Sequence, residues 1–531
     1  MGRAYDDNQT LQQKIMSGAN KLADNVASTL GPRGRNVLLK EKNNIPFITK
    51  DGVTVAHFVS SEDPFENASI QIIKQAAVET NNSAGDGTTT STVLARSILR
   101  ESQKFIASGI SPIELQRGID KAVRQVVSNL KEDCIPIQSI SDIQHVATIS
   151  ANNDQSIGKL IAMAFDRVGE DGAITIEESR SIDTSLDIAE GFKIESGYCA
   201  GAFVTDERRA MMNYEEPVIL VTDYKISTVE QILPILEMVA REGRPLIIVA
   251  EDIDGQALAA MIMNAMRGTL KVAAIKAPDY GEERRNTLSD LALSVGATFI
   301  TRESGAKLQD VKMVDFGTAK FVESSKSSTI FVGGNADVDE IETKIQSLKS
   351  LIEKTNSDTL GLQEANSIQK RIVRLASGVA VIRVGGSTEV EMIEKKHRIE
   401  DALGAVKAAQ DEGITSGGGT ALLRACQKMV ISTQNESPEQ ANGAVIVKNA
   451  CYEPIKQMAI NAGESPDLII DKVLKSDFGF GWDFRKNELS NLLDNGIIDP
   501  IKVTRVALQN AASCAGTLIT TNYGIIQTED K

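Results

Sequence analysis

Two glycine-rich segments hold the residue types that most directly suggest phosphate chemistry. The first, Gly85-Asp-Gly-Thr-Thr-Thr90, comes directly before the apolar segment that starts at Val93. Glycines let a ligand approach the backbone closely, and a helix N-terminus offers free N–H groups that favour phosphate. Because an aspartate beside a phosphate calls for a cation, the segment indicates metal-bound phosphate with Asp86 as an oxygen ligand. An ordinary Asp-Gly turn that caps a helix is the alternative.

The second segment is Gly417-Gly-Gly-Thr420, which leads into an apolar helix from Ala421. A flexible hinge or close backbone packing is its alternative explanation. Neither segment matches a common nucleotide motif, because the chain has no Gly-Lys-Ser/Thr and no Gly-x-Gly-x-x-Gly sequence. The absence of Gly-x-Ser-x-Gly argues against a hydrolase with a serine elbow.

Aspartates offer a second kind of chemistry, which is water activation or metal binding. Asp51, Asp86, Asp401 and Asp499 are the candidates, but pattern alone does not separate them from the other members of the 72 acidic residues. Asp401 ends a charged run that begins at Glu394, and a solvated helix face is the alternative for that run.

Composition excludes several classes of function. The 531 residues include 42% hydrophobic and 24% charged residues, which is typical of a globular chain of about three to four domains. A net charge of −15 and 4% aromatic residues make nucleic acid a poor partner, because an acidic surface repels phosphates and few rings can stack on bases. No aliphatic run approaches the length of a membrane span.

Cysteine and histidine usage points to a reducing compartment. Five cysteines and three histidines are scattered along the chain without a Cys-x-x-Cys pair. This disfavours a disulfide framework and a zinc site, so we expect cysteines that pack as small apolar residues. The polar N-terminus shows no secretory signal, and we expect a cytoplasmic protein.

The elements that must position these residues differ along the chain. Towards the N-terminus, apolar periodicity predicts helices over 11–30, 70–80, 92–105 and 114–131, short strands at 36–39 and 46–49, and a turn at 50–52. The C-terminal part is predicted to be mostly helical.

The middle of the chain alternates strands with helices. Strands are predicted at 217–221, 245–250 and 270–275, with helices from 227 and over 255–267 between them. This spacing predicts a parallel sheet with crossover helices. Residues 338–354 and 358–376 predict a helical hairpin, and 388–411 predict a long charged helix.

Six segments in order along the chain resemble the signatures of group I chaperonins, the GroEL type. They are Thr29–Asn36, Thr49–Gly52, Ala84–Thr90, Arg398–Leu403, Gly417–Gly419 and Ile498–Arg505. The likeness extends from about residue 11 to about residue 522. It implies a chaperonin fold of α and α/β domains: a mostly helical equatorial ATPase domain, a small intermediate hinge domain and an α/β apical domain.

The resemblance implies nested domains. The equatorial domain takes 1–132 and 412–531, the intermediate domain 133–189 and 379–411, and the apical domain 190–378. Hinges are implied at Pro136 with Gly413 and at Gly191 with Gly378, where glycine absorbs large backbone rotations.

The resemblance also implies ATP, Mg²⁺ and K⁺ as cofactors. The residues it places at the nucleotide are Thr29, Leu30, Gly31, Pro32, Lys50, Asp86, Gly87, Thr88, Thr89, Thr90, Gly418, Asp483 and Asp499. Among these, Asp86 is implied to bind Mg²⁺, and Thr29 and Lys50 backbone oxygens with the Thr89 hydroxyl to bind K⁺. Asp401 is implied to polarise the attacking water with help from Asp51, and Asp499 to accept ribose hydroxyls.

In the apical domain the resemblance implies an apolar groove for non-native protein and for a GroES-type co-chaperonin. The matching positions are Tyr198, Phe203, Leu233, Leu236, Leu258, Ile262 and Met263. A promiscuous apolar groove suits unfolded chains, which share only exposed apolar surface. From the residues alone, both stripes have burial in a core as their alternative.

Four departures indicate a divergent member. The chain ends at Thr528–Lys531 without Gly-Met repeats, and Ala202 stands where a second tyrosine is usual. Phe484 and Arg485, beside the implied adenine contact Asp483, are larger than the family's residues. Residues 1–10 resemble the family poorly. This segment normally pairs with a neighbouring subunit near the C-terminal strand, which we expect at Thr517–Thr521.

The function expected from the resemblance is ATP-driven protein folding in rings of seven subunits, as one ring or two. Its partners are unfolded client proteins and a GroES-type lid. The first alternative is a binding or scaffold protein that does not cycle on the same fold. The second is an enzyme that transfers phosphate to a small molecule, although we find no motif for a second substrate pocket.

Overall fold

The computed structural model describes residues 2–40, 46–169, 173–179, 181–189, 191–207, 209–354, 359–376, 379–430 and 437–528. The chain forms two compact units. Met1–Met163 and Gly386–Lys531 make the first, named the helical unit, and Ala164–Gly385 makes the second, named the sheet unit. The two segments predicted as intermediate are each divided between the units, and the three-domain division stays a prediction.

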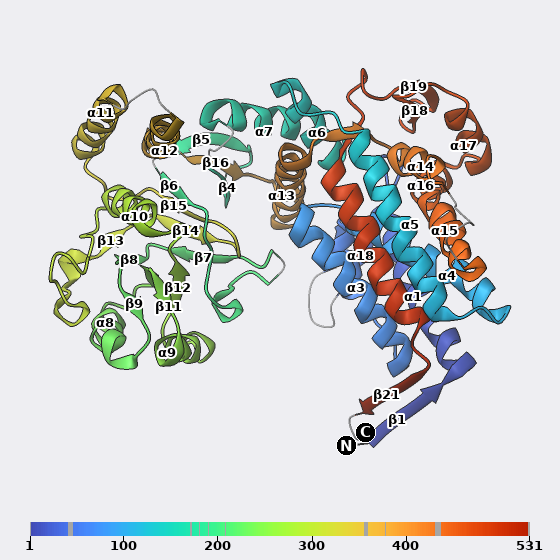
Figure 1. Cartoon of the computed structure of the whole chain (residues 1–531), viewed down its shortest axis with the longest axis horizontal. Helices are drawn as coiled ribbons and strands as arrows, with labels where there is room; N and C mark the ends of the chain where they lie inside the picture. Colours follow the sequence, from blue (N-terminus) through green and yellow to red (C-terminus); the bar gives the residue numbers. More distant parts are fainter. Residues whose placement is uncertain are drawn as a thin grey trace. The chain divides into compact units, whose positions relative to one another are not determined.

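The helical unit is built on long helices that pack side by side (Figure 1). The main ones are α1 (Asn8–Ala27), α3 (Pro64–Ala84), α4 (Thr88–Ala107), α5 (Pro112–Glu132), α15 (Pro438–Cys451) and α18 (Ile501–Ile519). Buried aliphatic side chains from all six form one core. Helix α4 is buried on most of its surface and contacts α1, α15 and α18, so it is the central helix of the unit.

Further helices complete the helical unit. They are α2 (Gly52–Phe58), α6 (Ile140–Ser150), α13 (Glu389–Glu412), α14 (Thr420–Gln427), α16 (Glu453–Ala462) and α17 (Pro466–Leu474). Helix α7 (Gln155–Val168) begins in this unit and continues into the sheet unit. The predicted helices are confirmed, with ends that differ by several residues, as is common for boundaries inferred from periodicity.

Local sequence explains where the helices beside residue 86 begin and end. Asp63 caps α3 by accepting bonds from Phe65 N and Glu66 N, and Pro64 occupies the first turn. Helix α3 ends at Gly85, whose φ of 73° is left-handed and favours glycine. Helix α4 follows Gly87, which is left-handed as well, with φ of 96°. Two tight glycine turns therefore fix the short link that holds Asp86.

Four two-stranded ribbons accompany the helices in the described part of the helical unit. The pairs are β2 (Val37–Leu39) with β3 (Phe47–Thr49), β17 (Ile414–Ser416) with β20 (Ile498–Pro500), β18 (Phe480–Asp483) with β19 (Glu488–Asn491), and β1 (Gly2–Asp7) with β21 (Tyr523–Thr528). The predicted strands near 36–39 and 46–49 are confirmed. The predicted turn at 50–52 is the start of α2, because Asp51 caps that helix.

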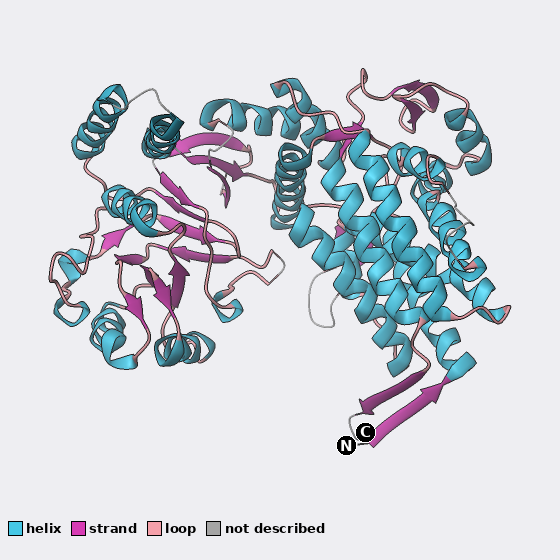
Figure 2. Ribbon diagram, in the orientation of Figure 1, coloured by secondary structure: helices cyan, strands magenta, loops and turns pink. Residues whose placement is uncertain are grey.

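The predicted position of the C-terminal strand is wrong. Residues Thr517–Ile519 form the last turn of α18, because Leu518 and Ile519 continue its buried stripe. The strand lies further on, and it pairs antiparallel with β1 of the same chain, Gly2 opposite Thr528 and Asp7 opposite Tyr523. Figure 2 shows this ribbon beside the two marked termini.

The sheet unit confirms the predicted parallel sheet. Its central strands β8 (Val218–Val221), β10 (Leu246–Ala250) and β12 (Val272–Lys276) are parallel, and β13 (Gly317–Thr318) adds an antiparallel edge. Helices α8 (Val229–Glu242) and α9 (Gly255–Met266) are the crossovers. All residues of β8 and β10 are buried, as expected for strands with covered faces.

Further sheets and helices complete the sheet unit. An antiparallel sheet has the order β6 (Gly191–Ile194), β15 (Thr329–Val332), β14 (Phe321–Ser324) and β7 (Met212–Glu215). A mixed sheet joins β4 (Ala173–Glu178), β16 (Val379–Val384) and β5 (Ser185–Ala189). The short pair β9 (Lys225–Ile226) and β11 (Asp252–Ile253) is parallel. Helix α10 (Gly281–Val295) packs beside the hairpin of α11 (Val338–Lys354) and α12 (Thr359–Ala376), which confirms the predicted hairpin.

Within the described ranges, no helix combines the length and apolar character needed to cross a membrane. The five cysteines are free thiols, and Cys426, Cys451 and Cys514 are buried in the core of the helical unit. This agrees with the expectation that they pack as small apolar residues.

Candidate functional site

A cavity of about 260 Å³ lies within the helical unit. It brings together residues of both glycine-rich segments and all four candidate aspartates, although these are far apart in the sequence. Every residue predicted to touch a nucleotide lines it: Thr29, Leu30, Gly31, Pro32, Lys50, Asp51, Asp86, Gly87, Thr88, Thr89, Thr90, Asp401, Gly418, Asp483 and Asp499. The cavity is the candidate functional site.

The first side of the cavity is the N-terminus of α4. Asp86 Oδ1 accepts a bond of 2.5 Å from Gly87 N, and Asp86 Oδ2 accepts one of 2.8 Å from Ser150 Oγ on α6. The Thr88 hydroxyl, in the first turn of α4, is buried and has no hydrogen-bond partner in the described structure. Free N–H groups at a helix start, beside an unpartnered hydroxyl, form a cradle for an anion.

The second side is the segment that leads from β3 into α2. Asp51 caps α2, with Oδ1 accepting from Val53 N and Oδ2 from Thr54 N, both at 3.0 Å. Lys50 Nζ donates to Gly31 O at 2.9 Å, which ties this segment to the turn after α1. A Cβ atom at Gly52 would lie 2.4 Å from Thr89 Oγ1, so glycine is required for this close approach.

The third side is made by β17 and β20, which come from distant parts of the chain. Their antiparallel pairing sets Thr415 opposite Asp499. A Cβ atom at Gly417 would lie 3.0 Å from Asp499 Oδ1, so the glycine run passes directly by this carboxylate. At Gly418 the nearest atom to such a Cβ is Trp482 O at 3.6 Å, an ordinary contact distance, so this position is less crowded than Gly417.

The fourth side is the turn between β18 and β19. Asp483 is buried, and its Oδ1 accepts bonds from Arg485 N at 2.8 Å and Lys486 N at 3.2 Å. Phe484 is buried with Trp482 in a small apolar cluster, so its large side chain is accommodated in the core. The exposed Arg485 donates to Asn153 Oδ1 at 3.3 Å, and Asn153 lies in the loop between α6 and α7.

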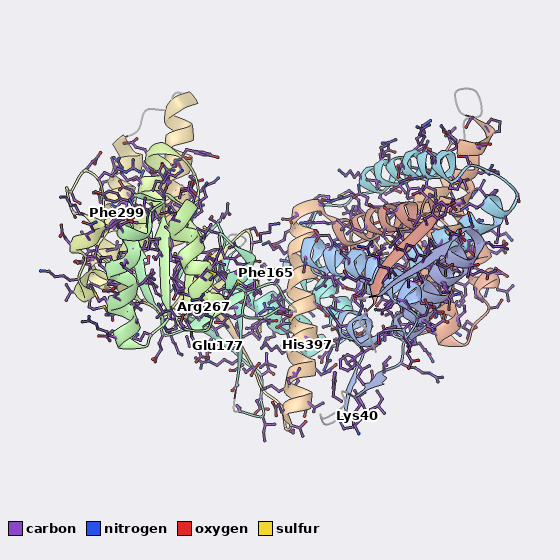
Figure 3. All side chains as sticks on the ribbon, turned by 90° about the horizontal axis from the view of Figure 1, so that it is seen from below. Lys40, Phe165, Glu177, Arg267, Phe299 and His397 are labelled. Carbon is purple, nitrogen blue, oxygen red and sulfur yellow. The ribbon has the colours of Figure 1, made fainter. Side chains whose placement is uncertain are left out.

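Helix α13 brings Asp401 to the same cavity. Glu394, His397 and Arg398 line it as well, and Figure 3 shows His397 on this helix. Arg398 donates to Asp154 Oδ2 at 3.2 Å and to Glu394 Oε2 at 2.7 Å. This face of the charged helix therefore lines the candidate cavity, and Asp401 does not lie on a fully solvated face.

Burial and mutual repulsion dominate the electrostatics of the cavity. Burial raises the pKa of Asp86, and the negative charge of Asp51 raises it further, against the bonds from Gly87 and Ser150. Burial and the charge of Asp86 raise the pKa of Asp499 to about 7. Burial, with the charge of Arg398, lowers the pKa of Lys50. The site therefore holds carboxylates that lack enough positive charge to stay ionised easily.

These residues fit a metal-bound polyphosphate. No three histidine, cysteine, aspartate or glutamate side chains among the described residues gather closely enough to hold a metal by themselves. Mg²⁺ commonly takes one or two carboxylates and completes its shell with phosphate oxygens and water. The free N–H groups of α4 and the unpartnered Thr88 hydroxyl match the phosphate part of such a ligand.

Several predicted residues lie elsewhere. Gly413 follows α13 with φ of 79°, next to the backbone bonds that join Ile135 and Ile414, and Pro136 comes directly after them. Gly191 begins β6 in the sheet unit. Gly378 lies outside the described residues. Their hinge role stays a prediction.

The predicted apolar groove is only partly on the surface. Leu233 on α8 and Met263 on α9 are exposed by 46% and 48%. Tyr198, Leu258 and Ile262 are partly buried against the core, whereas Phe203 and Leu236 are inside it. The latter two therefore support the surface from below, because their side chains fill the space between the helices and the sheet.

The sequence analysis missed residues that only the fold brings to the cavity. Ser150 donates to Asp86 across 64 positions, and no local pattern connects them. Arg398 was within a quoted motif, and its spacing of four from Glu394 indicated an ion pair.

In the sheet unit the sequence analysis also missed Met266. This residue is exposed by 73%, and it continues the α9 stripe from Met263.

The fold and this cavity define a chaperonin. A model of the TCP-1/cpn60 chaperonin family matches residues 22–529, so the chain belongs to that family.

Among solved structures, the chain is similar to the chaperonin gp146 from the bacteriophage EL 2 (Pseudomonas aeruginosa), crystallised in the presence of ATP-BeFx in two crystal forms. Both comparisons show 21% identity and cover 99% of each chain, with TM-scores of 0.69 and 0.63. At this identity the likeness establishes the fold.

The raised pKa of Asp499 predicts a stability that depends on pH. The folded protein holds this proton up to about pH 7, whereas an unfolded aspartate releases it near its ordinary value of 3.8. The free energy of unfolding therefore falls as pH rises between these values. We expect Asp499→Asn, without nucleotide or Mg²⁺, to be more stable than the unchanged protein by about 1–3 kcal/mol at pH 8 and equally stable near pH 4.

Urea denaturation at pH 4, 6 and 8 measures this difference. The exposed Asp120 on α5 provides the matched control, Asp120→Asn, for which we expect no such trend. A stability difference for Asp499→Asn that does not grow with pH would contradict the assignment.

Proposed function

We propose that this chaperonin hydrolyses ATP and uses the cycle to bind, enclose and release non-native proteins. The observation that carries the proposal is the convergence of Asp86, Asp499 and Asp401 on one cavity beside the N-terminus of α4. Membership of the family and the likeness to a chaperonin crystallised in the presence of ATP-BeFx support it. We place the protein in the cytoplasm, because its cysteines are free as in a reducing compartment.

The cavity residues divide the task. Gly87 and Thr88–Thr90 hold the phosphates at the start of α4, Gly418 and Asp499 hold the ribose end, and Asp483 lies at the base end. Asp86 holds Mg²⁺, and the Thr29 and Lys50 backbone oxygens with the Thr89 hydroxyl hold K⁺. The hydroxyl oxygens of Thr29 and Thr89 are 3.5 Å apart, so these two residues lie side by side at the proposed K⁺ position. The metal, when bound, neutralises charge that develops on the phosphates.

Asp401 orients and polarises the attacking water. A carboxylate suits this role, since it accepts the proton that the water loses as it attacks phosphorus. Asp51 assists through its charge, and the bonds that its carboxylate accepts from Val53 N and Thr54 N hold it in place. Because Asp401 lies on α13, hydrolysis depends on where that helix is held, and rotation at the hinges then times the cycle.

Two of the two-stranded ribbons, β1 with β21 and β2 with β3, support assembly into rings. The ribbon of β1 and β21 exposes Tyr5, Tyr523 and Ile525 by 66–67%, and that of β2 and β3 exposes Leu38 and Ile48 by 68% and 52%. Two-stranded ribbons with open edges are barely stable in water, so each gains from pairing with another ribbon. We propose that these ribbons pair between neighbouring subunits, in one or two rings of seven.

The sheet unit supplies the surface for clients and for a GroES-type lid. Leu233 on α8 and Met263 and Met266 on α9 are exposed, and the two helices pack against each other. Flexible methionines adapt to many partners, which suits a surface that must accept unrelated unfolded chains.

Removal of Asp401 tests the ATPase. We expect Asp401→Ala to lower kcat by about 100-fold or more, since general-base catalysis commonly contributes 10²–10⁴-fold, while nucleotide affinity stays nearly unchanged. Phosphate release under saturating Mg-ATP measures kcat. Asp411→Ala is the matched control, because Asp411 is on the same helix, outside the cavity, and pairs with Lys502. If the unchanged protein binds clients without hydrolysing ATP, the alternative of a non-cycling binding protein replaces this proposal.

A charge in a ribbon tests the ring. We expect Leu38→Glu to convert rings into monomers or open fragments, because a buried carboxylate in an apolar strand pair is strongly unfavourable. Electron microscopy and light scattering, with and without Mg-ATP, report the assembly. Ile182→Glu, at an exposed apolar position of the sheet unit, should leave rings intact. Rings of normal size for Leu38→Glu would contradict the proposed pairing.

Polar substitutions on α8 and α9 test client binding. We expect Leu233→Ser combined with Met263→Ser to weaken capture of a denatured model protein by about 10-fold or more, since each removes roughly 1–2 kcal/mol of apolar contact. The ATPase should continue. Val314→Ser is the control, because Val314 is exposed by 82% in the same unit but lies outside both helices. Equal capture by the double variant and the control would exclude this surface.

A further inference from the structure

The backbone of α13 touches the turn before Asp86 at a pair of glycines, Gly404 and Gly85. A Cβ atom built on Gly404 would lie 2.6 Å from Gly85 Cα and 2.8 Å from Gly85 O. One built on Gly85 would lie 2.3 Å from Gly404 Cα. These distances are far below any normal carbon contact, and the atoms met are backbone atoms that cannot turn aside. The two backbone segments can approach this closely only because both positions lack a side chain.

The two glycines have different local reasons for being glycine. Gly85 ends α3 in the left-handed region, with φ of 73°, so its own turn favours glycine. Gly404 lies in the interior of α13, where glycine weakens a helix and alanine would be the better choice. Local structure therefore does not explain Gly404, and the close contact with Gly85 does.

Each glycine of the contact is close in the sequence to an aspartate that lines the cavity. Gly85 directly precedes Asp86, and Gly404 follows Asp401 by three residues, which sets both on one face of the helix. One turn further, Ala408 packs with Ala84, Val503 and Val506 in a small buried cluster. The small side chains of Ala84 and Ala408 continue the close approach, so α13 packs against the end of α3 over two turns.

We propose that Gly404 is a positioning residue for hydrolysis: its contact with Gly85 sets how near α13 brings Asp401 to the phosphates held beside Asp86. The inference rests on the proposed ATPase and goes beyond it by assigning the contact that fixes the position of α13. A methyl group at 404 holds the helix away from the turn. The carboxylate of Asp401 then stands too far from the attacking water, whereas the nucleotide contacts, which belong to other elements, remain in place.

The test separates chemistry from binding in the Gly404→Ala and Gly404→Leu variants. Alanine and leucine both favour a helix more than glycine does, so α13 itself is not weakened. We expect kcat to fall about 10-fold for alanine and further for leucine, since a misplacement of about 1 Å can cost 100-fold. The dissociation constant of a fluorescent ATP analogue should change less than twofold. Lys407→Ala, at an exposed position of the same helix, should keep the unchanged kcat.

Each outcome decides a different statement. If the unchanged protein hydrolyses ATP and both Gly404 variants match it, the positioning role is overturned while the ATPase stands. If the unchanged protein does not hydrolyse ATP, the proposed function itself fails. Variants that lose nucleotide binding or the fold, judged by circular dichroism, would show that the contact serves folding and would also overturn the positioning role.

Discussion

Buried negative charge in the cavity of the helical unit is the constraint on which the rest of the site depends. Asp86 and Asp499 are removed from water, and this burial raises the pKa of both carboxyl groups. The negative charge of Asp51 raises the pKa of Asp86 further, and that of Asp86 raises the pKa of Asp499. Without a cation the site keeps protons that ordinary aspartates would release. A metal ion that arrives with its own phosphate oxygens relieves this repulsion, whereas a free anion would add to it. The proposed preference for a metal–nucleotide pair follows from that balance.

Close backbone approach is the means by which distant segments reach this charge. The cavity is lined by the chain near residues 29–32, 50–52, 86–90, 418–419, 482–485 and 497–500, and by one face of α13. At Gly52, Gly85, Gly404 and Gly417 a side chain would meet its neighbour at 3.0 Å or less. Glycine therefore lets the backbone approach a side chain at Gly52 and Gly417. At Gly85 and Gly404 it lets two backbone segments meet, and at Gly404 this comes at the expense of helix stability. The antiparallel pair β17–β20 then fixes the C-terminal segments against each other.

The sheet unit uses apolar side chains for two purposes on the same helices. On α8 and α9, Leu236 and Met261 are buried against the sheet, while Leu233, Met263 and Met266 face outwards. A helix that is apolar on its outer face is costly in water unless something covers it for part of the time. This asymmetry is the physical basis for assigning the surface to transient partners such as unfolded chains.

The sequence by itself determined the order of the elements, and it predicted the residues of the site. The glycine-rich turn before α4 and the alternating strands and helices of the parallel sheet were predicted, because these signals are local, whereas the start of α2 was predicted only as a turn. The six motifs include the cavity threonines and four of the cavity aspartates, and Asp483 was predicted separately as an adenine contact. The tertiary structure decided what local signals cannot contain: that Ser150 bonds to Asp86, that Phe484 is buried, that the C-terminal strand is Tyr523–Thr528, and that Phe203 and Leu236 are core. A helical stripe looks the same whether its partner is a core or a client, and a glycine inside α13 gains its meaning only from Gly85, which is more than 300 residues away in the sequence but in contact in space.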